Sequence, residues 1–147
     1  MATRFNPKPR GLTLVEQMFR MSTLRPEFRV TLHQRQRSVT WVGKIRPAPM
    51  SNEYTVQVEL TIGLRPKVKV LNPELKVRDG ATCLPHYYPE DKSLCLHQAH
   101  EWNSLFSVAD CIVPWTAFWL YFYEVWFFTG SWEGGGTHPV KPEHQAA

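Results

Sequence analysis

Four stretches between residues 28 and 71 alternate apolar and polar side chains, the pattern of strands that bury one face. They are residues 28–33, 39–45, 53–62 and 67–71. The third is the clearest and places on one face Tyr54, Val56, Val58, Leu60 and Ile62. In the first, the residues expected to face together are Phe28, Val30 and Leu32. Residues 47–52 are rich in turn formers and predict a hairpin between the second and third stretches. We therefore predict a four-stranded antiparallel meander with one polar face.

Two segments show helical spacing instead. The first covers residues 12–21, ends before Pro26, and has as its apolar stripe Leu12, Val15, Met18 and Phe19. The second begins near Ser104 or Ser107, and its stripe is Val108, Ile112, Trp115, Trp119 and Phe122. Between sheet and second helix, residues 72–104 form a long loop without sustained periodicity. This order predicts an α+β fold with helices packed on one face of the sheet.

The length of 147 residues fits one compact domain. We assign residues 11–133 to it and expect residues 1–10 and 134–147 to be flexible ends. Residues 105–128 are largely apolar, but three residues interrupt them: Asp110, Pro114 and Glu124. The longest apolar run is therefore shorter than the roughly 20 residues that a bilayer requires, and we expect buried helices and no membrane partner.

Cysteine content and the N-terminal residues indicate a compartment. The chain has three cysteines, an odd number, and its first ten residues lack the apolar run of a secretory signal. Both features favour free thiols in a reducing environment. We expect a cytoplasmic protein.

The net charge of +4 is unevenly distributed along the chain. Residues 1–50 carry +8, whereas residues 51–147 carry −4. A basic half can attract nucleic acid, an acidic protein or a membrane surface. The arginines are scattered over several predicted elements, however, so a solvated basic face is the simpler interpretation and nucleic acid is not the partner we expect.

The long loop holds most of the side chains that can do chemistry: Cys83, His86, Tyr87, Tyr88, Glu90, Asp91, Cys95, His97, His100 and Glu101. Three interpretations compete. Two of its cysteines and three of its histidines could hold zinc, although their spacing is irregular and contains no Cys-x2-Cys pair. Cys95, between Leu94 and Leu96, could be a small buried apolar residue. It could also be a nucleophile in a polar, partly open loop.

The order of several short motifs resembles that of ubiquitin-conjugating enzymes over residues 11–128. The second strand, Trp41-Val42-Gly43-Lys44-Ile45, is similar to their W-x-G-x-I, and the third and fourth strands follow as in that family. Next come Pro85-His86-Tyr87-Tyr88-Pro89, Ser93-Leu94-Cys95-Leu96 and Trp102, which resemble the H-P-N motif, the segment around the catalytic cysteine and the Trp of the following helical region. The resemblance implies that Cys95 accepts an activated carboxyl group as a thioester.

The resemblance fails at the asparagine of H-P-N, which has no counterpart here. Depending on how the motif is aligned, His86 or Tyr88 occupies its place, and either side chain can donate a hydrogen bond. We therefore add both to the candidate catalytic residues. Four groups could accept the proton of an incoming amine, with no basis for ranking them: Asp91, His97, His100 and Glu101.

The C-terminal part, residues 114–139, is dense in Trp and resembles the bacterial branch of the family found in type II CBASS antiphage operons. That resemblance implies a partner, the C-terminus of a cGAS-like nucleotidyltransferase, and an acceptor, a lysine amine. No cofactor or metal is implied. The glycines at 134–136 lack the Lys-Ser/Thr of a phosphate-binding loop, so ATP activation of the carboxylate must come from elsewhere. The alternatives are a non-catalytic binding module of the same fold and a basic nucleic-acid-binding protein.

Overall fold

The computed structural model describes residues 10–97 and 101–135. In chain order these form α1 (Leu14–Leu24), β1 (Arg29–His33), β2 (Ser38–Ile45), β3 (Tyr54–Thr61), β4 (Lys67–Asn72), β5 (Tyr87–Tyr88), β6 (Ser93–Leu94), the π-helical turn η1 (Val108–Ile112) and α2 (Val113–Thr129). The α+β fold of the ubiquitin-conjugating-enzyme type is thereby confirmed. The predictions of flexible ends, residues 1–10 and 134–147, fall almost entirely outside the described residues.

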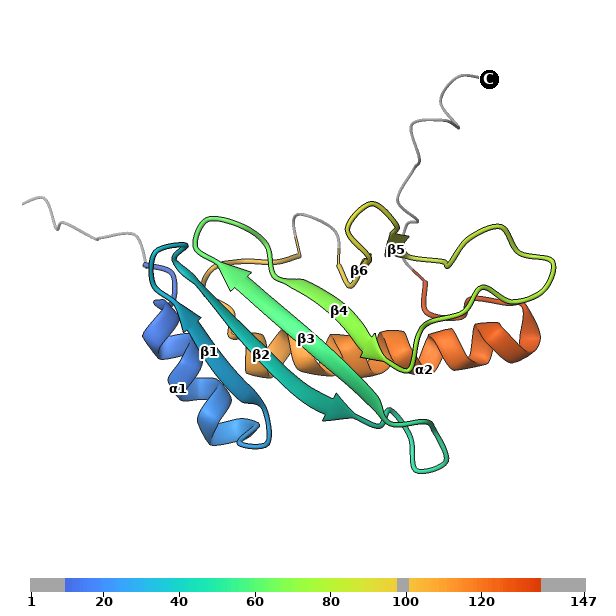
Figure 1. Cartoon of the computed structure of the whole chain (residues 1–147), viewed down its shortest axis with the longest axis horizontal. Helices are drawn as coiled ribbons and strands as arrows, with labels where there is room; N and C mark the ends of the chain where they lie inside the picture. Colours follow the sequence, from blue (N-terminus) through green and yellow to red (C-terminus); the bar gives the residue numbers. More distant parts are fainter. Residues whose placement is uncertain (1–9, 98–100, 136–147) are drawn as a thin grey trace, which may run out of the picture.

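The four long strands form one antiparallel sheet in the order β1-β2-β3-β4 (Figure 1). The predicted alternation holds best in β3, where every second side chain is buried. Ile62 lies one residue beyond this strand and is exposed, so the prediction that it joins the buried face was wrong. In β1, Val30 and Leu32 pair with buried residues of β2 but are themselves exposed, because β1 is an edge strand with a neighbour on one side only.

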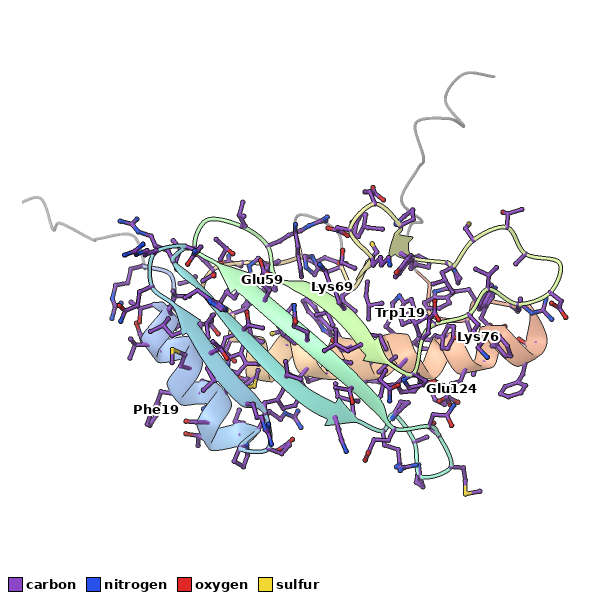
Figure 2. All side chains as sticks on the ribbon, viewed as in Figure 1. Phe19, Glu59, Lys69, Lys76, Trp119 and Glu124 are labelled. Carbon is purple, nitrogen blue, oxygen red and sulfur yellow. The ribbon has the colours of Figure 1, made fainter. Side chains whose placement is uncertain are left out.

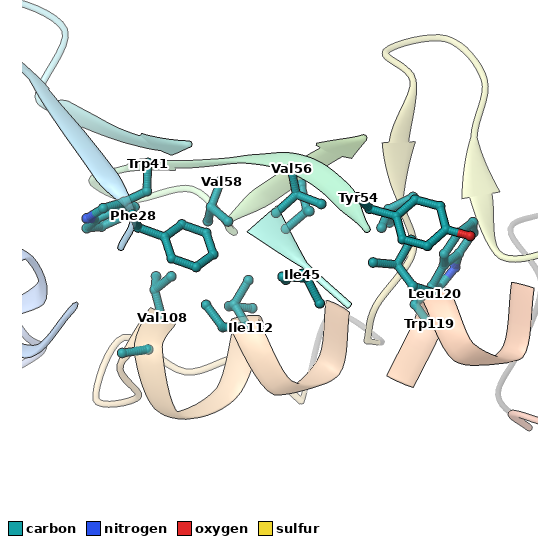
Figure 3. Packing of buried hydrophobic residues seen from close by; sticks show 14 of the residues in the cluster. Phe28, Trp41, Ile45, Tyr54, Val56, Val58, Val108, Ile112, Trp119 and Leu120 are labelled. Atoms are coloured by element: carbon teal, nitrogen blue, oxygen red, sulfur yellow. The ribbon is translucent and has the colours of Figure 1, made fainter. Parts of the chain in front are cut away.

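The main core lies between the sheet and the η1–α2 segment, which crosses behind it (Figures 1 and 3). The sheet contributes, among others, Trp41, Val56 and Val58, and the helical segment contributes Ile112 and Leu120. Gly43 of β2 admits the ring of Phe28, since a Cβ at this position would lie 2.6 Å from the ring carbons. A glycine is required here for close packing within the sheet layer.

Helix α1 packs against η1 and β2 and begins with a capping box in which Thr13 and Glu16 bond each other's backbone N–H. The apolar stripe predicted for it was wrong in part. Met18 packs against the core, but Val15 and Phe19 are 70% and 72% exposed, and Phe19 projects away from the molecule in Figure 2. Its fully buried residues are Gln17 and Met21.

The Gln17 amide is buried because it serves two backbone groups at once. Its nitrogen donates to the Phe106 carbonyl at 2.8 Å, and its oxygen accepts from the Val108 N–H at 2.9 Å. These bonds provide partners for two backbone groups at the point where the chain enters the last helical segment. A polar residue therefore faces the core where spacing alone favours an apolar one.

The last helical segment begins at Ser107, one of the two predicted starts, whose hydroxyl caps the Asp110 N–H. Of its predicted stripe, Val108, Ile112 and Trp119 are buried as expected, whereas Trp115 and Phe122 are only half-buried. Thr116, Leu120 and Tyr123 are buried in the core as well. Thr116 is tolerated there because its hydroxyl donates to the Ile112 carbonyl at 2.7 Å. Among the helices of the described residues, none combines the length and apolar character needed to cross a bilayer.

Candidate functional site

Cys95 follows a small hairpin inside the long loop. Strands β5 and β6 pair Tyr87 with Leu94 and Tyr88 with Ser93, and the Cys95 N–H extends the ladder by donating to the His86 carbonyl at 2.9 Å. Leu94 is buried in the core, and β6 lies beside β4. Because side chains alternate along a strand, Cys95 lies on the opposite side from Leu94 and is only half-buried.

The His86 carbonyl fastens this loop to the helix behind it. It accepts both the Cys95 N–H and the indole N–H of Trp119, the latter at 2.9 Å. His86 adopts a left-handed backbone with φ of 48°, which costs about 1–3 kcal/mol for a non-glycine residue. The two hydrogen bonds to its carbonyl help to hold this conformation. The residue is 5% exposed, and its ring stacks on Trp132 with 4.9 Å between ring centres.

A groove of about 240 Å³ opens beside Cys95 and has mainly aromatic walls. We call it the aromatic groove. Helix α2 contributes Trp115, Phe118, Trp119 and Phe122, the loop contributes His86, Cys95, Leu96, His97 and Glu101, and the segment after α2 contributes Trp132, Gly134 and Gly135. Trp115 and Phe122 are only half-buried because their rings line this groove, although Trp115 also packs against the core.

Tyr88 contacts both Cys95 and a residue from another part of the chain. Its hydroxyl accepts a hydrogen bond of 2.8 Å from the Arg65 guanidinium, which also lies 4.4 Å from the centre of the Tyr88 ring. Tyr88 lies opposite Ser93 in the β5–β6 pair, so its side chain projects on the same face of the hairpin as Cys95. The Cys95 thiol itself donates a weak hydrogen bond of 3.9 Å to the His97 carbonyl. Burial first, and then the contact with Cys95, raise the pKa of Tyr88 above its ordinary value, while Arg65 opposes this rise. The hydroxyl is therefore protonated at neutral pH and can donate.

The other two cysteines differ from Cys95 in surroundings. Cys83 is exposed, Cys111 is half-buried in η1, and neither is among the residues that line the aromatic groove. Burial, followed by the nearby Asp110 carboxylate, raises the pKa of Cys111. Its thiol is thus a poorer nucleophile at neutral pH.

The predicted proton acceptors do not share one environment. Asp91 accepts hydrogen bonds from the backbone and side chain of Ser93, and Lys67 lies 3.5 Å away. Burial raises the pKa of Asp91, but these partners outweigh it and hold the pKa below its ordinary value. A carboxylate so engaged is a weak base.

His97 and Glu101 border the aromatic groove, and His97 packs against Trp115 with 5.6 Å between ring centres. The other candidate, His100, lies outside the described residues. Over residues 10–97 and 101–135, no three or more His, Cys, Asp or Glu side chains form a group suited to hold a metal ion.

Sequence reasoning missed two residues that the structure brings to the site. Arg65 stands alone before Pro66, in no motif, and nothing in the sequence couples it to Tyr88 23 positions later. Trp132 belongs to the Trp-rich C-terminal part, but its stacking on His86 depends on the chain turning back after α2. The left-handed Gly130 after α2 permits that turn.

The comparisons with known proteins identify the family of the chain. Residues 17–139 match the family model for the type II CBASS E2 protein, which is most of the chain. No curated protein matches. The chain therefore belongs to the type II CBASS E2 family, and its role in such a system is E2-like.

Proposed function

We propose that Cys95 accepts the activated C-terminal carboxyl group of a cGAS-like nucleotidyltransferase as a thioester and passes it to a lysine amine. The observation that carries the proposal is the position of one thiol. Cys95 is partly accessible at the wall of the aromatic groove, and the Tyr88 side chain, which carries a hydroxyl donor, lies on the same face of the β5–β6 hairpin.

Loading begins when the Cys95 thiolate attacks the carbonyl carbon of an activated acyl donor. A carbon–sulfur bond forms, and the donor's leaving group departs with its electron pair. The donor is an acyl adenylate or a thioester made by a separate ATP-dependent protein, because this chain has no Walker-type phosphate-binding motif. Nucleophilic catalysis of this kind divides one difficult acyl transfer into two easier ones.

Transfer follows when a neutral lysine amine attacks the thioester carbonyl. The carbon–nitrogen bond forms, the carbon–sulfur bond breaks, and the sulfur leaves as thiolate. The amine proton passes to a base, for which His97 and Glu101 are the candidates at the groove. A hydrogen bond to the tetrahedral oxyanion is worth about 3 kcal/mol in hydrolases, and Tyr88 and His86 are the candidate donors.

The features of the groove suit an extended protein tail. Its aromatic walls offer apolar surface to the chain that precedes the carboxyl group. The three cysteines are free, which suits a thioester chemistry in the reducing cytoplasm of a bacterial cell. We propose that compartment for the reaction.

The test is co-expression of the chain with its candidate nucleotidyltransferase and activating protein, followed by gels with and without reductant. We expect an adduct that thiols remove from wild type. Cys95→Ala should abolish it, and Cys95→Ser should convert it into an oxyester that resists thiols. Cys111→Ala, the matched control, should retain it. An adduct that survives Cys95→Ala and disappears in Cys83→Ala or Cys111→Ala contradicts the proposal. Binding of the partner without any adduct identifies a non-catalytic binding module and also contradicts it.

A further inference from the structure

Arg65 reaches the candidate site from outside the loop that builds it. It lies between β3 and β4, directly before the buried Pro66, which fixes the backbone at this point. Its guanidinium contacts Tyr88 in two ways, through a hydrogen bond of 2.8 Å to the hydroxyl and by lying 4.4 Å from the ring centre. Two contacts restrict the phenol more than either would alone.

The direction of the hydrogen bond between Arg65 and Tyr88 follows from the donor inventory. A guanidinium has only N–H donors, so the Tyr88 oxygen must be the acceptor of the bond with Arg65. A phenol has a single proton, and this bond leaves that proton available for the Cys95 sulfur, which lies on the same face of the β5–β6 hairpin. The arrangement thus leads from Arg65 through the Tyr88 hydroxyl toward Cys95. A donor polarised by a cation behind it is a stronger donor.

We propose that Arg65 is a positioning residue that orients the Tyr88 hydroxyl to donate to the Cys95 sulfur. This inference rests on the proposed function, in which that sulfur is a thiolate twice: when it attacks the acyl donor and when it leaves. In both states the Tyr88 proton lies toward the negative charge, and no bond to Arg65 or Tyr88 is made or broken.

Lys67 offers a matched control from the same region. It is two residues further on, carries the same charge, and also ties the loop to β4, through Asp91 at 3.5 Å. No bond joins it to Tyr88 among the contacts of the described residues. Arg65→Met and Lys67→Met therefore remove the same charge and a similar anchor, but only the first removes the hydrogen bond to the Tyr88 hydroxyl.

The experiment is the rate of Cys95 alkylation by iodoacetamide as a function of pH. Cleavage after glutamate isolates Cys95 from the other cysteines, since Glu90 and Glu101 flank it. The groups near the thiol that also titrate or carry charge are His86, His97, Glu101 and Asp91, and all of them stay unchanged in the variants.

We expect Arg65→Met to slow alkylation at neutral pH about threefold to fivefold, a size suited to a partly exposed charged contact, and to move the half-maximal rate to higher pH. Tyr88→Phe should do the same. The Arg65→Met/Tyr88→Phe double variant should be no slower than Tyr88→Phe alone, because both act through one hydroxyl. Lys67→Met should change the rate less than about twofold.

Equal effects of Arg65→Met and Lys67→Met would overturn the inference, because charge alone would then explain the rate. Fully additive effects of Arg65→Met and Tyr88→Phe would overturn it too. The adduct gel on the same variants separates this inference from the proposed function. A wild-type adduct with no effect of Arg65→Met on alkylation refutes the role of Arg65 only. A clear effect on alkylation without any wild-type adduct supports the role of Arg65 and refutes the thioester proposal.

Discussion

Trp119→Phe tests whether the core controls the geometry at Cys95. The Trp119 ring is 3% exposed, faces the core from α2, and donates its N–H to the His86 carbonyl at 2.9 Å. Phenylalanine keeps an aromatic ring but removes that donor and about three buried ring atoms. The lost apolar contact costs about 2 kcal/mol and the lost hydrogen bond about 1 kcal/mol. The free energy of unfolding should therefore fall by about 3 kcal/mol.

The matched control is Trp126→Phe. Trp126 is buried on the same helix, two turns further on, and packs against Tyr123 with 6.1 Å between ring centres. This variant loses a similar apolar area, about 2 kcal/mol, but leaves the bond to His86 in place. Urea unfolding followed by circular dichroism gives the stability of both, and alkylation of Cys95 under folding conditions gives the state of the loop.

We expect both variants to be destabilised, and only Trp119→Phe to change the alkylation rate of Cys95, because the His86 carbonyl then keeps one of its two donors. Equal alkylation rates in the two variants would show that the loop holds Cys95 without help from α2. A Trp119→Phe protein as stable as wild type would refute the packing argument itself.

Three further predictions concern the scaffold. Gly43→Ala should lower the free energy of unfolding by about 1–3 kcal/mol in urea titrations, because the new methyl group meets the Phe28 ring; adding Phe28→Leu should restore part of the loss, and no restoration contradicts this explanation. Gln17→Leu should cost about 2–4 kcal/mol in the same assay, since the Val108 N–H and a backbone carbonyl lose their partner; a neutral effect contradicts the role of the amide. Asp91→Asn should cost about 1 kcal/mol at neutral pH. Its partners lower the pKa of Asp91 in the folded state, so this contribution is present above the ordinary value of 3.8 and declines as the pH falls through the lowered one. A difference in the free energy of unfolding between wild type and Asp91→Asn that stays constant as the pH falls contradicts this explanation.

The sheet could be predicted because strand alternation reports directly on a buried face. Tyr54, Val56 and Val58 are all in the core, as their spacing indicated. Helical spacing was less informative, since it identifies a stripe but not what covers it. In α1 the stripe with Val15 and Phe19 faces outward, because Gln17 is needed on the inner face for two backbone groups.

In the candidate site, too, the local features could be predicted and the contacts with distant segments could not. The position of Cys95 followed from a local motif, and the hairpin that presents it is local too. Arg65 and Trp132 could not be predicted, because each meets the loop only through the folding of a distant segment. The burial of the α2 aromatics also depends on that loop. Trp119 is buried and donates to the His86 carbonyl, whereas Trp115 and Phe122, which line the aromatic groove together with it, are only half-buried.

The most direct test of the account is to find the acyl group on the wild-type protein. The chain, co-expressed with its partner and trapped in acid, is cut after glutamate so that the three cysteines fall on separate peptides. We predict that the peptide between Glu90 and Glu101 carries the mass of the partner's C-terminal residues, and that a thiol removes this mass. The same mass on a peptide containing Cys83 or Cys111, with the Cys95 peptide unmodified, would contradict the account.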